Sequence, residues 1–173
     1  RPEQGYPLRG SGVGIPRFAD VVAAFPDVCW NLDLKQRDIE QAVADEVNRL
    51  GIEDRVLIGS FHDRRIREFR RVTRGRVATS AGPRETARAR AAASAGRRPR
   101  GGADAFQVPE RAGPLRVVTR RFIEAAHRAG KQVHVWTVND ADAMHRLLDL
   151  GVDGIVTDRP DVLNDVLDER SSR

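Results

Sequence analysis

Three segments of the chain repeat one pattern of apolar and polar positions: an amphipathic helix, a glycine, and an apolar strand that ends on polar residues. The glycines fit helix ends because glycine tolerates the left-handed backbone conformation found just past a helix C-terminus. We therefore expect Gly51, Gly130 and Gly151 to end the three helices, and Thr119 to cap the start of the second. The predicted helices cover 38–50, 119–129 and 139–150, and the predicted strands 55–60, 132–138 and 153–157.

Weaker signals extend the same alternation. Strands are also predicted near 28–34, 76–79 and 104–108, helices from Pro16 to Phe25 and from Pro83 to Ala95, and a loop over 96–102. Repeated helix and strand units with short links imply parallel strands joined by right-handed crossovers. The six strands predict an α/β fold, either an open doubly wound sheet or most of a barrel.

Composition adds limits to this picture. A chain of 173 residues, 40% hydrophobic and 32% charged, predicts a single domain over 1–173. No stretch approaches the roughly 20 apolar residues of a membrane span, and Arg1–Gly5 lacks the layout of a signal peptide. These features predict a cytoplasmic protein, although the chain has no initiator methionine. The lone cysteine, Cys29, leaves no internal disulfide and no cysteine-based zinc site.

The basic character of the chain comes from arginine. The net charge is +5, and Lys35 and Lys131 are the only lysines. Arginines are dense between Arg64 and Arg100, and within the domain 82–103 forms an Arg/Ala/Gly-rich helix and loop. Such a run could follow nucleic-acid phosphates, but it carries no interleaved stacking aromatics. A solvated helix face is therefore favoured and no nucleic-acid partner is expected; an Arg-rich nucleic-acid binder is the weaker alternative.

The first predicted strand ends on side chains that suit chemistry. Alternation places Asn31, Asp33 and Lys35 on the face opposite Trp30, Leu32 and Leu34. With the apolar face under helices, the polar face would point toward the mouth of a barrel, where barrel enzymes place catalytic groups. A carboxylate and an ammonium two residues apart can bind a metal ion and an anionic oxygen side by side. The alternative is a buried Asp–Lys pair with a purely structural role.

The other candidate residues are aromatic or histidine. His134 and Trp136 share one face of the strand over 132–138. Trp136 is equally compatible with a ligand-pocket wall and with the core, whereas His134 lies deeper and is predicted to be a hydrogen-bonded interior histidine. His127 is predicted to be solvated or packed on its helix. His62 and Asp63 follow a strand end, which suits either a site or the start of a helix.

Short motifs at strand ends and helix starts follow one another along the chain: Ile15-Pro16-Arg17-Phe18, Asn31-Leu32-Asp33-Leu34-Lys35, Gly59-Ser60-Phe61, Gln107-Val108-Pro109, Ala126-His127-Arg128-Ala129-Gly130, Val135-Trp136-Thr137-Val138-Asn139 and Asp153-Gly154-Ile155-Val156-Thr157-Asp158-Arg159-Pro160. Each motif alone is weak, but the ordered set is specific, and its last two members are the strongest. Taken in this order, the motifs resemble those of glycerophosphodiester phosphodiesterases, from about Gly14 to Leu167.

The resemblance implies a TIM (β/α)8 barrel of the phospholipase-C-like phosphodiesterase type. It implies a phosphoric diester hydrolase of lipid metabolism that converts small glycerophosphodiesters to glycerol 3-phosphate and an alcohol, with Mg²⁺ or Ca²⁺ as the divalent metal. Asp33 would stand at a metal-binding position that is commonly glutamate in the family, and Lys35 would be a catalytic residue near the phosphate. Trp136 would line the glycerol side of the substrate pocket, and Phe61 would supply part of its apolar wall.

The sequence departs from the family at its beginning. The family starts with His-Arg-Gly at the end of the first strand, followed by an acidic pair and by a second histidine before an aspartate. These motifs have no counterpart here; Arg9-Gly10 lacks the preceding histidine. The six strands are therefore expected to be the last six of eight, and this chain alone to be weakly active or inactive. The alternative is a non-catalytic barrel fragment that assembles through its two unpaired sheet edges.

Overall fold

The structure is a computed structural model that describes residues 10–172. Arg1–Gly5 and Arg9, on which two of the predictions above depend, lie outside the described residues. Six parallel strands appear in the predicted order. They are β1 (Trp30–Asp33), β2 (Val56–Gly59), β3 (Ala78–Thr79), β4 (Ala105–Pro109), β7 (Gln132–Trp136) and β8 (Gly154–Ile155). Five are shorter than the sequence pattern suggested, and β4 has the predicted length, shifted by one residue.

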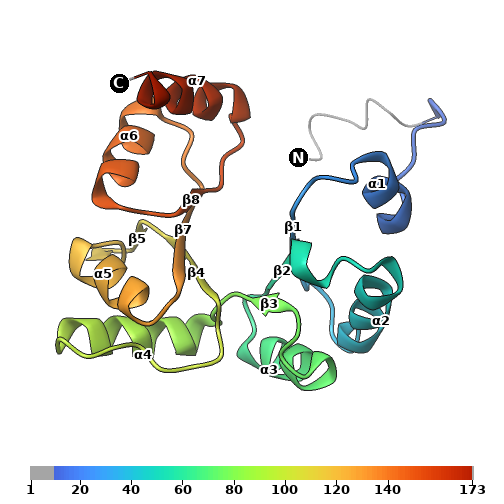
Figure 1. Cartoon of the computed structure of the whole chain (residues 1–173), viewed down its shortest axis with the longest axis horizontal. Coiled ribbons are helices and arrows are strands. Elements are labelled where there is room, and N and C mark those ends of the chain that lie inside the picture. The colour runs from blue at the N-terminus through green and yellow to red at the C-terminus, as the bar shows by residue number, and fades with distance from the viewer. Residues whose placement is uncertain (1–9, 173) are drawn as a thin grey trace.

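The six strands form one arc. Hydrogen bonding gives two three-stranded sheets, β1-β2-β3 and β4-β7-β8. A parallel bridge between Ser80 and Ala105 joins them, supported by the bond from the Ala81 amide to the Ala105 carbonyl at 2.8 Å. Within residues 10–172 the arc does not close, and β1 and β8 are its two edges (Figure 1). The six strands expected from an eight-stranded barrel are thus present, in an open arrangement.

Helices cover the outer side of this arc, which Figure 1 shows for both halves. A doubly wound sheet would carry helices on both faces, so the arrangement favours the barrel-like alternative. The sequence pattern did not predict the helix over 160–171 or the hairpin β5–β6, and it offered the start of the helix over 63–73 only as one of two alternatives for His62 and Asp63. The helices are α1 (Phe18–Ala24), α2 (Glu40–Leu50), α3 (Asp63–Thr73), α4 (Pro83–Ser94), α5 (Arg120–Arg128), α6 (Ala141–Leu150) and α7 (Pro160–Ser171), and the hairpin strands are β5 (Arg111–Ala112) and β6 (Leu115–Arg116).

Helix ends follow the local chemistry of the sequence. Gly51 and Gly151 end α2 and α6 in the left-handed conformation, with φ of 64° and 100°. The Thr119 hydroxyl accepts a bond from the Phe122 amide at 3.3 Å, and the Asp140 carboxylate accepts one from the Ala143 amide at 2.8 Å. These N-caps satisfy amides that have no partner inside the helix. The predicted stops at Gly51 and Gly151 and the predicted cap at Thr119 are confirmed, whereas α2 begins at Glu40, two residues after the predicted start.

The core lies between the arc and its helices, in two clusters. One cluster packs α4 to α7 against β4 and β7 around residues such as Phe106 and Phe122, whose ring centroids are 5.2 Å apart. The other packs α1 to α3 against β1 and β2 around Ile58 and Phe69. The outer face of β1 is apolar as predicted, with Leu34 only 2% exposed. This packing leaves the concave face of the arc for polar side chains.

The arginine-rich region forms a structural surface of α3 and α4. Arg70 donates from Nε to Thr79 at 2.7 Å and from both terminal nitrogens to Glu85 at 3.0 Å, which ties α3 to α4. Arg71, one residue later, pairs with Glu68 on its own helix. Arg71 fits the predicted solvated helix face, whereas Arg70 departs from it, because its side chain is only 20% exposed. Among residues 10–172 no helix is long and apolar enough to cross a membrane.

Candidate functional site

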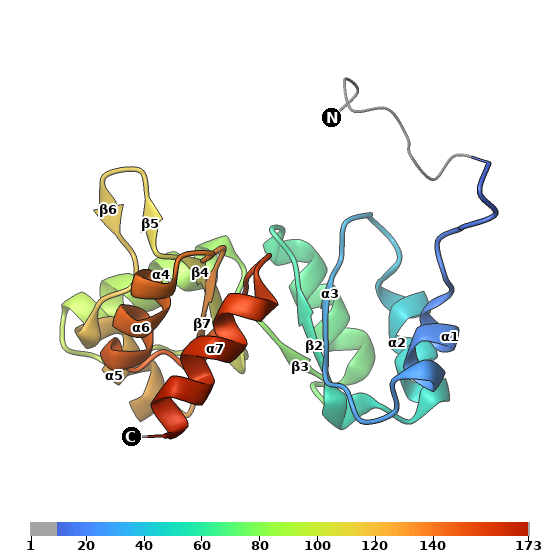
Figure 2. The ribbon, with the colours of Figure 1, turned by 90° about the horizontal axis from the view of Figure 1, so that it is seen from above.

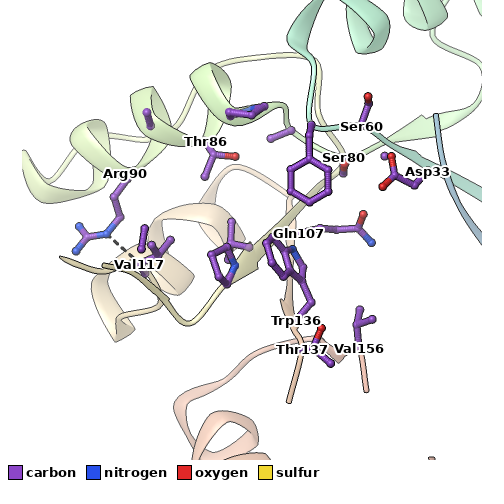
Figure 3. A pocket seen from close by; sticks show the side chains of 18 of the residues that line it. Asp33, Ser60, Ser80, Thr86, Arg90, Gln107, Val117, Trp136, Thr137 and Val156 are labelled. Carbon is purple, nitrogen blue, oxygen red and sulfur yellow. Dashed lines mark hydrogen bonds between the residues drawn. The ribbon is translucent and has the colours of Figure 1, made fainter. Parts of the chain in front are cut away.

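The carboxyl ends of the strands meet around one cavity of about 660 Å³. All four residues singled out by the resemblance line it: Asp33, Lys35, Phe61 and Trp136. Asp33 ends β1, Phe61 follows β2 and Trp136 ends β7, so side chains far apart in sequence converge because parallel strands end on the same side. Figure 3 shows Asp33, Gln107 and Trp136 facing this space.

Asp33 and Lys35 form an ion pair at the first strand end. Lys35 Nζ donates to Asp33 Oδ2 at 2.5 Å. The Lys35 side chain is 73% exposed and that of Asp33 34%, so the alternative of a buried structural pair does not hold. An exposed ion pair contributes little to stability, because water screens both charges. The Lys35 ammonium therefore remains accessible to an anionic group of a ligand, and the Asp33 carboxylate to a cation.

Two aromatic rings line the cavity next to this ion pair. Phe61 and Trp136 meet edge to face, with ring centroids 5.6 Å apart and planes at 79°. Lys35 Nζ lies 5.5 Å from the centre of the Phe61 ring, within the range of a cation–π contact. Phe61 is 59% exposed despite its size. The three side chains therefore place a cation and an apolar wall side by side, and Trp136 is a wall residue of the cavity.

The floor of the cavity is polar and closely fitted. Gln107 Nε2 lies 3.4 Å from His134 Nδ1, and His134 Nε2 lies 3.0 Å from Gln132 Oε1. These contacts fit a neutral imidazole that accepts at Nδ1 and donates at Nε2. A Cβ on Gly59 would lie 3.1 Å from Gln107 Oε1, so glycine there makes room for the glutamine.

His134 is the interior histidine that the pattern predicted. Its burial lowers the pKa, and the negative charge of Asp153 partly opposes that shift. A Cβ on Gly154 would lie 2.9 Å from His134 Cδ2, so the ring packs directly against the β8 backbone. His134 is thus a packed, hydrogen-bonded residue beneath the cavity.

The remaining histidines and Asp63 have structural positions. His127 Nε2 lies 2.8 Å from Asp153 Oδ2, and the His127 side chain is 42% exposed, in line with the predicted solvated or packed role. His62 is the residue before α3, and Asp63 begins that helix. The Asp63 carboxylate accepts bonds from the Arg84 and Glu85 amides at 3.1 and 3.4 Å, and so caps α4. The helix-start interpretation of this pair is confirmed.

The motif residues after β7 and β8 hold the two strand ends together. Asn139 Oδ1 accepts bonds from the Thr157 hydroxyl at 2.9 Å and from the Asp158 amide at 2.8 Å. Asn139 Nδ2 donates to Asp158 Oδ2 at 3.2 Å. This network fixes the segment next to Trp136 and Thr137, which line the cavity; the peptide bond between these two is cis. The Asn139 motif therefore positions the cavity wall.

Several wall residues had no signal in the sequence that marked them as part of a site. Ser80 follows β3, where the pattern predicted only a short strand, and Thr86 lies on α4, where it predicted an alanine-rich helix. Ala112 and Leu115 belong to the hairpin β5–β6, which had no clear strand signal. The Gly113-Pro114 dipeptide marks a turn and was the one available hint of a hairpin. Gln107 appeared in the family pattern but was not assigned a role.

The described residues supply one carboxylate at the expected metal position and no complete metal site. Within residues 10–172 there is no group of three or more His, Cys, Asp or Glu side chains that could hold a metal ion. Mg²⁺ and Ca²⁺ require about six or more oxygen ligands. Asp33 fits the chemistry of a single ligand, and its carboxylate is engaged by Lys35.

Comparison with known proteins agrees with this geometry. Residues 3–162 match the family model described as the Glycerophosphoryl diester phosphodiesterase family. A Mycobacterium tuberculosis protein described as probable glycerophosphodiester phosphodiesterase 2 is 41% identical over 163 residues, which cover 91% of this chain and 62% of the relative. The chain thus spans about three fifths of that relative's length.

Solved structures give the same result. A crystal structure of a glycerophosphoryl diester phosphodiesterase from Silicibacter pomeroyi matches with a TM-score of 0.73 and 26% identity, over 92% of this chain and 58% of that one. The fold is also shared with an Oleispira antarctica phosphodiesterase solved with the product sn-glycerol-3-phosphate, with a TM-score of 0.60 and 14% identity over 86% of this chain and 58% of that one. By the extent of the family match, this chain belongs to the glycerophosphoryl diester phosphodiesterase family.

Proposed function

We propose that this chain carries part of the active site of a glycerophosphodiester phosphodiesterase. The reaction is hydrolysis of a glycerophosphodiester, in lipid metabolism, to glycerol 3-phosphate and an alcohol. The observation that carries the proposal is the convergence of the Asp33–Lys35 ion pair and the Phe61–Trp136 wall on one cavity. The family match and the product bound in the Oleispira antarctica structure support it.

The fold proposal concerns the position of these strands in the whole enzyme. We propose that β1, β2, β3, β4, β7 and β8 correspond to the last six of the eight strands of a TIM barrel. The parallel order, the edges at β1 and β8, and the 62% coverage of the Mycobacterium tuberculosis relative support this assignment. The two remaining strands would fit between β8 and β1.

Lys35 is the proposed catalytic residue. Its ammonium group is exposed and lies at the mouth of the cavity, so it can exchange the Asp33 carboxylate for a phosphate oxygen. A fixed positive charge at that point stabilises negative charge that develops on the phosphate as the diester bond breaks. Phe61 and Trp136 would hold the carbon skeleton of the substrate beside it, with Trp136 on the glycerol side.

Asp33 is the proposed ligand of a divalent metal, Mg²⁺ or Ca²⁺. Bound next to the phosphate, such an ion would neutralise part of its charge. One carboxylate among residues 10–172 does not complete the coordination sphere, so tight binding needs donors outside the described residues. We expect this chain to bind either ion only weakly.

The expected turnover of this chain depends on which groups can transfer protons to and from the substrate. A general acid or base must lie within hydrogen-bond reach of the reacting oxygens, and histidine serves this role most often. Among the described residues that line the cavity there is no histidine. We therefore propose that the 173-residue chain has little or no turnover and that the general acid and base come from the two histidines expected in the family.

The test separates binding from turnover. Glycerol 3-phosphate binding would be measured by calorimetry for the unmodified chain, Lys35→Met and Arg64→Met, since Arg64 is an exposed cation that does not line the cavity. We expect about a tenfold loss with Lys35→Met, as for one charged hydrogen bond, and no change with Arg64→Met. Equal affinity of both variants would contradict the role of Lys35.

Turnover would be measured as glycerophosphocholine hydrolysis with Mg²⁺ or Ca²⁺. The comparison is between this chain and a version extended by the upstream reading frame, with activity expected only in the extended protein. Rapid hydrolysis by the 173-residue chain would contradict the assignment of proton transfer to groups outside it.

A further inference from the structure

The cavity continues well beyond the ion pair. Figure 3 shows Asp33, Ser60 and Gln107 on one side of Trp136, and Thr86, Arg90 and Val117 on the other. This second part lies between helix α4 and the hairpin β5–β6. We refer to it as the apolar arm, and it is lined by Ala87, Pro109, Ala112, Leu115 and Val117.

Large apolar side chains are exposed along the whole cavity, in the apolar arm and outside it. Leu115 is 55% exposed, Phe61 59% and Val156 38%, and all three line the same cavity. Large apolar side chains gathered at one exposed site mark a surface that binds an apolar group. Trp136 stands where the polar end passes into the apolar arm (Figure 3), and Phe61 packs against its ring. Residues of both ends line one cavity, so the two ends are continuous.

The hairpin that forms the outer wall is held in place. Arg90 donates from Nε to the Val117 carbonyl at 3.0 Å and from Nη2 to the Arg116 carbonyl at 2.9 Å. At the other strand of the hairpin, Arg146 binds the Glu110 carboxylate through two bonds of 3.0 and 2.9 Å. Figure 2 shows the hairpin projecting from the body of the molecule next to α4 and α6.

These bonds also determine the polarity of the apolar arm. The third nitrogen of Arg90, Nη1, donates to the Ser94 hydroxyl at 2.8 Å. Its guanidinium group is thus directed to the backbone and to its own helix, and the wall presented to the cavity is made mainly of methyl groups and proline rings. An arm of this chemistry favours hydrocarbon over a charged or strongly hydrated alcohol.

We propose that the apolar arm binds the hydrocarbon chain of an acylated glycerophosphodiester, a single-chain phospholipid, while Lys35 holds its phosphate. The inference rests on the proposed function, because Lys35 fixes which end of the ligand enters the polar side. The cavity of about 660 Å³ is large enough for a ligand of this size. Each methylene group that becomes fully buried raises the affinity about fourfold.

Ligand binding to the 173-residue protein would be measured by calorimetry, with each ligand dissolved as single molecules and not as micelles. The series is glycerophosphocholine, then hexanoyl, octanoyl and decanoyl lysophosphatidylcholine, with octyl glucoside as a ligand that has a chain but no diester. We expect affinity to rise about two- to fourfold for each added methylene group, since burial is partial. Octyl glucoside should bind at least tenfold more weakly than the octanoyl diester.

Two substitutions test where the acyl chain of the ligand binds. Leu115→Asp, and Ala87→Trp as a second variant that fills the arm, should remove the dependence on chain length and leave glycerophosphocholine affinity unchanged. The matched control is Leu167→Asp, because Leu167 is 43% exposed on α7 and does not line the cavity. Equal effects of Leu115→Asp and Leu167→Asp would show that the acyl chain of the ligand binds elsewhere, and would overturn the inference.

The outcomes for the two proposals differ. Affinity that does not change with acyl-chain length overturns the apolar arm and leaves the Lys35 assignment intact. Octyl glucoside binding as well as the octanoyl diester would show that the phosphate adds no affinity, and so would overturn the role of Lys35. If Lys35→Met leaves the affinity for every diester unchanged, the proposed function fails, whatever the dependence on chain length.

Discussion

Substitution of Arg70 tests whether a buried ion pair contributes more to the free energy of unfolding of this protein than an exposed one does. Its guanidinium group binds Thr79, Glu85 and the Ser80 carbonyl, at 2.7 to 3.3 Å. The Arg70 and Glu85 side chains are only 20% and 17% exposed. Since Ser80 lines the cavity, the same bonds hold part of the site. The test substitution is Arg70→Met, which keeps most of the apolar stem and removes the charge.

The expected loss in the free energy of unfolding depends on the Glu85 carboxylate, which keeps its charge when Arg70 is replaced. Breaking a fully buried ion pair by removing one partner costs about 3–5 kcal/mol. Partial exposure lets water reach the remaining Glu85 carboxylate, which also keeps a bond from the Ala103 amide at 3.2 Å. We therefore expect a loss of about 2–3 kcal/mol in the free energy of unfolding, a large share of the ~5–15 kcal/mol typical of a domain.

The neighbouring arginine is a matched control. Arg71 lies on the same helix and pairs with Glu68, but the two side chains are 71% and 42% exposed. Arg71→Met should cost less than ~0.5 kcal/mol, because exposed pairs within a helix contribute little. Both variants would be compared with the unmodified chain by urea unfolding followed by circular dichroism. Equal costs, or a cost below ~1 kcal/mol for Arg70→Met, would refute the argument from burial.

Two further predictions concern pH and assembly. Because burial lowers the pKa of His134 below its ordinary value of 6.5, the unfolded chain takes up this proton at higher pH than the folded one, so the free energy of unfolding should fall as the pH drops below about 6.5. His134→Gln should flatten that dependence in urea titrations between pH 5 and 7, and an unchanged slope would contradict it. The unpaired edges of β1 and β8 should drive self-association, seen as a concentration-dependent shift in size-exclusion chromatography; a monomer at all concentrations would argue against edge pairing and the assembly alternative.

The sequence by itself determined the features that depend on local geometry. Alternation along β1 placed Asp33 and Lys35 on one face and Leu34 on the other, because successive side chains of a strand point in opposite directions. Glycine stops and capping residues marked helix ends because their bonds span only a few positions. The family resemblance then assigned Asp33, Lys35, Phe61 and Trp136 to one site, and the structure brings all four to the same cavity.

Tertiary structure decided what depends on contacts between distant segments. The hairpin β5–β6 is held as a wall by contacts between distant segments, such as the bond from Arg90 to the Val117 carbonyl, 27 positions along the chain. Arg70 and Arg71 are the same residue type side by side, yet the side of α3 that faces α4 makes one a buried tie and the other a surface charge. Such differences in burial arise when helices and strands pack, so they cannot be deduced from the periodicity of one segment.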